Sequence, residues 1–109
     1  MNSPSVLPLT VSDYDAMRRR GDAHELFDVR TPHERAIASI EGSTLLDRAG
    51  QQRLLALPRE TTLVFQCHHG VRSHSAALWA IEQGFSRVYN LLGGIEAWSI
   101  EIDPDVPRY

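Results

Sequence analysis

Lysine is absent from this chain of 109 residues, and all eleven basic residues are arginine. This excludes chemistry that needs a lysine amine, such as a Schiff base or the phosphate-binding lysine of a Walker motif. The chain has one cysteine, Cys67, which excludes an intramolecular disulfide and any Cys-x-x-Cys zinc or redox motif. A lone thiol fits a reducing compartment, and residues 1–10 lack the basic and apolar regions of a signal peptide. We therefore expect a cytoplasmic protein.

Long hydrophobic runs and a strong net charge are also missing. No apolar stretch approaches the length of a membrane-spanning helix, so we expect no membrane association. The formal net charge of −3 gives no electrostatic reason to expect nucleic acid or an anionic membrane as a partner. With 42% hydrophobic and 23% charged residues, the composition is that of an ordinary globular protein. We expect one domain over residues 1–109, with a short extended tail at 103–109.

Short apolar segments alternate with helical segments along the chain. The predicted strands are 6–9, 25–29, 42–46, 62–66 and 87–91. The predicted helices are 12–20, a short one that starts at Thr31, 47–57, 72–83 and 93–98. This alternation implies right-handed crossovers and a mostly parallel sheet covered by helices on both faces. The predicted fold class is therefore α/β.

Three of the helix starts carry capping signals. Ser12 is the expected N-cap of the first helix, which Gly21 ends. Thr31-Pro32-His33-Glu34 combines threonine at the N-cap, proline at N1 and glutamate at N3, which predicts a capping box. Asp47 is the expected N-cap of the third helix, and Pro58 stops it.

Cys67 lies between a predicted buried strand and the N-terminus of a predicted helix. Backbone N–H groups at such a helix start point toward whatever the sulfur carries, and the helix dipole adds partial positive charge. Gly70 permits the left-handed backbone that a tight, anion-cradling loop requires. These surroundings favour the thiolate, which lowers the pKa of the thiol below that of a free cysteine. A single cysteine is often an inert buried thiol, but these features predict a nucleophile that solvent can reach.

The other residues of this loop have more than one interpretation. Arg72 would oppose the helix dipole unless an anion compensates it, which favours a role in holding an anionic reactant. His68, His69 and Val71 are predicted to lend amide N–H groups, with both histidine side chains near the entrance. Adjacent histidines normally point different ways and no further ligand set is evident, so we expect no metal site. For Ser73, capping of the helix is favoured over donation to the loop.

Asp28 and Arg30 follow the second predicted strand. Ligand sites of parallel sheets lie beyond the carboxyl ends of the strands, so this segment is expected near Cys67. Both residues could support the site, but a structural role is favoured. In that role Asp28 fixes the following loop, and Arg30 pairs with it or with Glu34.

These segments resemble the rhodanese family of sulfurtransferases, specifically its small single-domain members. The matching segments, spread in order across nearly the whole chain, are 27–32 with Glu34, 67–73, 84–85, 88–91, 93–95 and 97–98. The resemblance implies a five-stranded parallel sheet flanked by helices and no cofactor. It also implies that the loop cysteine takes a sulfane sulfur from a donor such as thiosulfate and becomes a persulfide. The sulfur then passes to a thiophilic acceptor, which is cyanide in assays and a protein or small thiol in cells.

Carried onto this chain, the resemblance makes Cys67 the sulfur carrier. The amides of residues 68–72 would stabilise the persulfide, and Arg72 would help to hold the donor. The tail at 103–109 resembles the end of rhodanese modules fused to ubiquitin-activating-like adenylyltransferases, which points to delivery to a sulfur-carrier protein or into a cofactor pathway.

Two other functions remain open. Rhodanese folds also serve as non-catalytic binding or regulatory modules, although the retained cysteine, glycine and arginine argue against this. Related phosphatases and arsenate reductases have one more residue between cysteine and arginine. Here four residues separate Cys67 from Arg72, the shorter form associated with sulfur transfer.

Overall fold

A computed structural model describes residues 4–109 of the chain. Strands and helices alternate in the order β1 (Leu7–Leu9), α1 (Val11–Arg20), β2 (Glu25–Asp28), α2 (Pro32–Ile37), β3 (Thr44–Leu45), α3 (Arg48–Leu55), β4 (Leu63–Gln66), α4 (Val71–Glu82), β5 (Val88–Leu91) and α5 (Gly94–Glu101). The five strands form one parallel sheet in the order β1-β5-β4-β2-β3. The predicted α/β class and the five-stranded parallel sheet are therefore confirmed.

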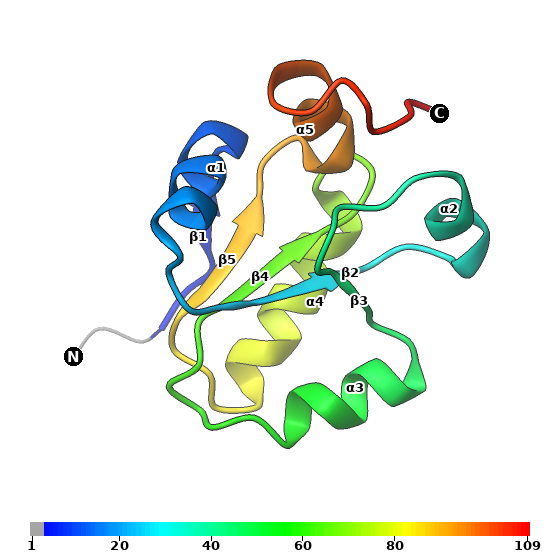
Figure 1. Ribbon diagram of the computed structural model, residues 1–109. Coiled ribbons are helices and arrows are strands. Elements are labelled where there is room, and N and C mark those ends of the chain that lie inside the picture. The colour runs from blue at the N-terminus through cyan, green and yellow to red at the C-terminus, as the bar shows by residue number, and fades with distance from the viewer. Residues whose placement is uncertain (1–3) are drawn as a thin grey trace.

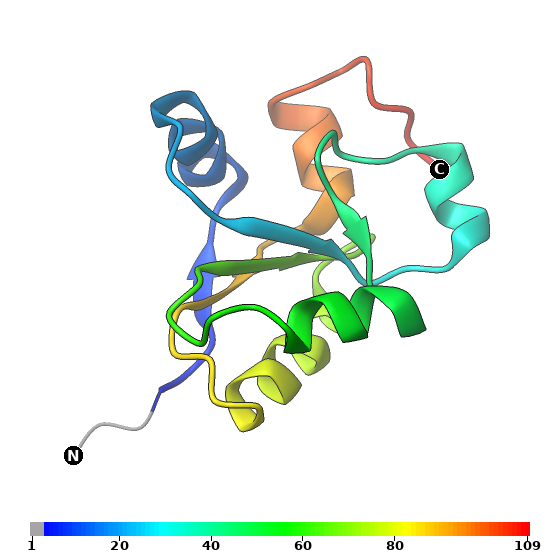
Figure 2. The same ribbon diagram turned by 60° about the horizontal axis from the view of Figure 1, so that its bottom comes forward.

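Helices cover both faces of the sheet (Figures 1 and 2). On one face, α1 and α5 pack against a core that includes Leu26 and Val64. On the other face, α3 and α4 pack against Phe27 and Phe65, whose rings stack with centroids 5.8 Å apart. Side chains of neighbouring positions on β2 and β4 thus point to opposite faces, as the pleat of a strand requires. Because successive side chains of these buried strands point to opposite faces, the same two strands contribute to the hydrophobic cores on both sides of the sheet.

The helix starts test the capping predictions. Thr31 and Glu34 form the predicted capping box of α2, and Asp47 caps α3 by accepting from the N–H of Gly50 at 2.8 Å. For α1 the prediction is wrong: the N-cap is Thr10, whose Oγ1 accepts from the N–H of Asp13 at 3.1 Å. Ser12 lies inside the helix, because the extended backbone at Thr10 starts the helix two residues earlier than predicted.

The register of the sheet places the segments that matter side by side. Asp28 at the end of β2 pairs with Gln66 at the end of β4, and Cys67 follows Gln66 directly. Residues after the two strands therefore meet at one edge of the sheet, as predicted. The tail segment (residues 103–109) returns from α5 toward α2 at this same edge (Figure 2). Within residues 4–109, none of the helices is long and apolar enough to cross a bilayer.

Candidate active site

The cysteine loop (residues 67–72) connects β4 to the first turn of α4. Gly70 has φ of 102°, in the left-handed region, and is the N-cap residue of α4. A Cβ on Gly70 would lie 3.3 Å from the carbonyl oxygen of Leu91, so both backbone conformation and space favour glycine here. The left-handed backbone predicted at Gly70 is therefore present.

The N-terminus of α5 holds the other side of the loop. The N–H groups of Ile95 and Glu96 donate to the carbonyl oxygens of Cys67 and His68 at 2.9 and 3.1 Å. Gly94 lies so close to these two carbonyl groups that a Cβ would collide with both. Gly93 and Gly94 at the start of α5 therefore let this helix pack closely against the cysteine loop.

The Cys67 sulfur accepts hydrogen bonds from the residues that follow it. The N–H of Gly70 lies 3.1 Å from Sγ, and the N–H and hydroxyl of Ser73 each lie 3.4 Å away. Burial raises the pKa of the Cys67 thiol, but the hydrogen bonds from Ser73, Gly70 and His69 outweigh it, so the pKa is lowered overall. The direction agrees with the sequence prediction.

Ser73 does not cap α4, so the favoured interpretation of this residue is wrong. Its hydroxyl lies between two acceptors, Cys67 Sγ and Asn90 Oδ1, the latter at 2.5 Å. The Asn90 amide also donates to the carbonyl oxygen of Gly70 at 3.0 Å. A hydroxyl has one proton, so Ser73 can turn it toward the sulfur when the sulfur becomes charged. Sequence reasoning missed Asn90, since the register that brings β5 beside β4 is not visible in the sequence.

The exposure predicted for the cysteine is wrong in this structure. Only 1% of Cys67 is accessible to solvent. The physical reason is the tightness of the loop: groups close enough to donate to the sulfur also cover it. We call the part of the loop that covers the sulfur the rim. A reactant must therefore displace part of this rim before it reaches Sγ.

Arg72 has a fixed partner that sequence reasoning missed. Its two terminal nitrogens donate to the two carboxylate oxygens of Glu34, at 2.6 and 2.9 Å. The bonds with Glu34 raise the pKa of Arg72, and the charge of Cys67 adds to this effect. The bonds from Arg72 in turn hold the pKa of Glu34 far below its usual range. The anion that compensates Arg72 at the start of α4 is thus Glu34, a residue of the protein itself.

Asp28 and Arg30 form an ion pair whose side chains have no exposure to solvent. Two nitrogens of Arg30 donate to the two oxygens of Asp28, at 2.7 and 2.8 Å, and one also donates to the carbonyl oxygen of Ala38. Arg35 adds a second guanidinium to Asp28 at 3.0 Å. These bonds fix the segment between β2 and β3 and fit the structural interpretation.

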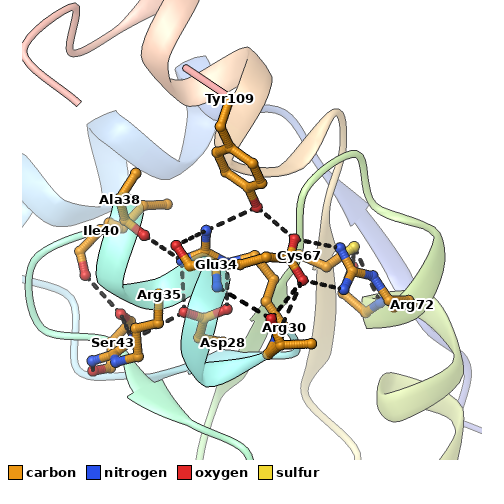
Figure 3. A network of polar contacts seen from close by, with 12 residues as sticks. Asp28, Arg30, Glu34, Arg35, Ala38, Ile40, Ser43, Cys67, Arg72 and Tyr109 are labelled. Carbon is orange, nitrogen blue, oxygen red and sulfur yellow. Dashed lines mark hydrogen bonds and ion pairs between the residues drawn. The ribbon is translucent and has the colours of Figure 1, made fainter. Parts of the chain in front are cut away.

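Tyr109, at the far end of the chain, joins this network (Figure 3). Its hydroxyl accepts from Arg30 at 3.0 Å and donates to Glu34 Oε2 at 2.7 Å. Its ring stacks on His68, with centroids 4.0 Å apart and planes inclined by 13°. The sequence predicted an extended tail here and gave no signal that its last side chain would reach the cysteine loop.

His68 and His69 do not diverge as predicted, since their rings stack with centroids 4.0 Å apart. Glu96 lies 3.5 Å from His68, and the ligand atoms of the three residues lie within 4.8 Å of one another. A third possible metal ligand therefore exists, contrary to the sequence reasoning. Glu96 also accepts from Arg108 at 2.8 Å, and this guanidinium opposes a further cation at the same carboxylate.

Comparisons with known proteins identify the family of the chain. The rhodanese-like domain family matches residues 10–101, and the chain belongs to this family. Thiosulfate sulfurtransferase GlpE of Stutzerimonas stutzeri is 39% identical over 92 residues, which cover 84% of this chain and 83% of GlpE. A rhodanese-like domain protein of Staphylococcus aureus has the same fold, with a TM-score of 0.77 at 21% identity over 95% of this chain and 99% of that one.

Two longer plant proteins also match. The rhodanese-like/PpiC domain-containing protein 12 of Arabidopsis thaliana is 38% identical over 81% of this chain, and the chain spans 31% of its length. Adenylyltransferase and sulfurtransferase MOCS3-2 of Zea mays is 33% identical over 98% of this chain, which spans 25% of that protein.

Proposed function

We propose that this protein is a sulfurtransferase that carries a sulfane sulfur on Cys67 as a persulfide. The observation that carries the proposal is the set of donors around Sγ, which lowers the pKa of a buried thiol. The names of GlpE and the maize relative both contain sulfurtransferase, which supports the same class.

The proposed reaction has two displacements and needs no cofactor. In the first, the Cys67 thiolate attacks the outer sulfur of thiosulfate. A new S–S bond forms, the S–S bond of thiosulfate breaks, and sulfite leaves with its electron pair. In the second, cyanide or a thiolate attacks the outer sulfur of the persulfide, and the Cys67 thiolate leaves. The donors on Sγ stabilise the thiolate that begins and ends this cycle.

The acceptor in cells is part of the proposal. With one cysteine in the chain, release of the sulfur depends on an outside nucleophile, either a small thiol or a sulfur-carrier protein. The resemblance of the tail to rhodanese modules fused to adenylyltransferases favours the sulfur-carrier protein, and the match to the maize adenylyltransferase and sulfurtransferase supports that resemblance.

A phosphatase or arsenate reductase is the weaker alternative. The loop has four residues between Cys67 and Arg72, and the sulfur lies buried beneath it. This leaves less room for a tetrahedral oxyanion than the longer loop of those relatives. We expect no turnover of an aryl phosphate or of arsenate.

Mass spectrometry of the intact protein after thiosulfate treatment tests the proposal. We expect a gain of one sulfur atom that dithiothreitol reverses, together with thiocyanate formation when cyanide is added. The Cys67→Ser variant should show neither. A wild-type protein that never gains sulfur from thiosulfate would instead favour a non-catalytic binding module.

A further inference from the structure

The tail segment is fixed against α5. Val106 is 9% exposed and belongs to the core beneath α1 and α5. The Ser99 hydroxyl donates to the carbonyl oxygen of Val106, and Arg108 forms an ion pair with Glu96. These contacts place Tyr109 over the active-site edge of the sheet.

Tyr109 is linked to both ends of the cysteine loop, directly at one end and through Glu34 at the other. Its ring stacks on His68, the first residue after the cysteine. Its hydroxyl donates to Glu34, which holds both terminal nitrogens of Arg72, the last residue of the loop. The same hydroxyl accepts from Arg30, so it is anchored to the buried ion pair below. A polar chain thus runs from the interior through Tyr109 and Glu34 to the guanidinium of Arg72 (Figure 3).

We propose that Tyr109 is a positioning residue of this active site: its hydroxyl fixes Glu34 and thereby Arg72, and its ring fixes His68 at the rim. The consequence for sulfur transfer rests on the proposed function, whereas the consequence for the Cys67 thiolate does not.

The hydroxyl affects the charge that Arg72 presents. Glu34 Oε2 accepts from both Tyr109 and Arg72, so part of the carboxylate charge is taken up by the phenol. Burial raises the pKa of Tyr109, so at neutral pH its hydroxyl keeps the proton that it donates. Without that donor, Glu34 is freer to move and more of its negative charge faces Arg72. The site then attracts an anion less strongly, while a neutral reactant is little affected.

Alkylation of Cys67 tests this inference without requiring turnover. The rates with iodoacetate, an anion, and iodoacetamide, which is neutral, are measured for the wild type, Tyr109→Phe and Arg72→Gln. Phenylalanine keeps the stacking on His68 and removes only the hydroxyl. For Tyr109→Phe we expect the iodoacetate-to-iodoacetamide rate ratio to fall about threefold, the effect of one ordinary hydrogen bond, toward the Arg72→Gln value. Tyr89→Phe is the matched control, because Tyr89 lies on β5 against β1, and its ratio should not change.

A second substitution tests the ring. Tyr109→Ala should lower the ratio as Tyr109→Phe does and should also raise the rates with both reagents, because the rim at His68 is opened. An iodoacetate-to-iodoacetamide ratio that is unchanged in Tyr109→Phe would overturn the inference, whether both rates stay the same or change by the same factor.

Thiosulfate kinetics separate this inference from the proposed function. For Tyr109→Phe we expect the KM for thiosulfate to rise about threefold with kcat retained. A wild type that gains no sulfur refutes the proposed function, and the alkylation ratio then still decides the role of Tyr109. A wild type that gains sulfur, with Tyr109→Phe identical to it in KM and alkylation ratio, refutes only the role of Tyr109.

Discussion

Removing the Ser73 hydroxyl should destabilise the Cys67 thiolate, relative to the thiol, more than any other single side-chain substitution that leaves the backbone unchanged. Among the groups that lower the pKa of Cys67, the Ser73 side chain has the largest effect. Ser73 has no exposure to solvent, so in Ser73→Ala water does not readily replace the lost hydroxyl. We therefore expect the variant to have a raised pKa at Cys67.

The magnitude follows from the geometry of the bond. A hydrogen bond to a charged acceptor contributes about 1.5–3 kcal/mol. The Ser73 hydroxyl lies 3.4 Å from Sγ and also faces Asn90, so the low end of this range applies. About 1.5 kcal/mol corresponds to roughly a tenfold fall in the ratio of thiolate to thiol at a fixed pH below the midpoint.

The assay is the pH dependence of the iodoacetamide rate, supported by the ultraviolet absorbance of the thiolate. Both signals belong to Cys67, because the chain has no other cysteine. Ser75→Ala is the matched control, since Ser75 is an exposed serine on the same helix. A midpoint for Ser73→Ala that equals the wild-type value, or lies below it, would refute the role of this hydroxyl.

Three further substitutions test the frame of the site. Gly70→Ala should lose sulfur loading and about 1–3 kcal/mol of stability, whereas Gly21→Ala, with φ of 73° but open space around it, should lose stability alone; equal loading in both would contradict this. Glu34→Gln should cost about 1 kcal/mol at neutral pH in urea unfolding, a modest value because Arg72 is half exposed. The pKa of Glu34 is depressed in the folded state, so its stabilisation is present at neutral pH and is lost as the pH falls below about 4; a constant difference from the wild type down to acid pH would argue against the pair. Asp28→Asn should cost about 3 kcal/mol or more, since it leaves buried Arg30 without its charge partner, and a loss below about 1 kcal/mol would show the pair to be dispensable.

Local sequence signals predicted most of the fold. Thr31 and Glu34 are three residues apart, and their capping box needs only the backbone of one helical turn. Gly70 and Cys67 are likewise close in sequence, so the turn between them could be inferred. The error at Ser12 has the same local origin: Thr10 and Ser12 both have side chains suited to an N-cap, and the sequence does not say which residue has the extended backbone.

Contacts between distant segments were the ones that sequence reasoning missed. Glu34 and Arg72 are 38 positions apart, and Tyr109 is 75 positions from Glu34. Glu34 already had a local explanation as a cap, and one residue can serve both purposes because its two carboxylate oxygens accept several donors. Asn90 illustrates the same point, because its role depends on which strand lies beside β4.

The burial of Cys67 discriminates between two ways of activating the thiol. A helix dipole and one guanidinium act through the field at the sulfur, and this guanidinium is half exposed and already paired with Glu34. Solvent screens this field and Glu34 largely neutralises it. The field therefore lowers the pKa of Cys67 only slightly, whereas burial of a thiol with 1% exposure raises that pKa strongly. The donors that lie 3.1 to 3.4 Å from Sγ replace the hydrogen bonds from water that the thiolate loses on burial. They therefore lower the pKa of Cys67 even though the sulfur is buried inside the loop. The lowered pKa of this buried thiol is therefore attributable mainly to Gly70 and Ser73. For Arg72 we instead expect a role toward the anionic reactant, which the alkylation ratio of Arg72→Gln tests.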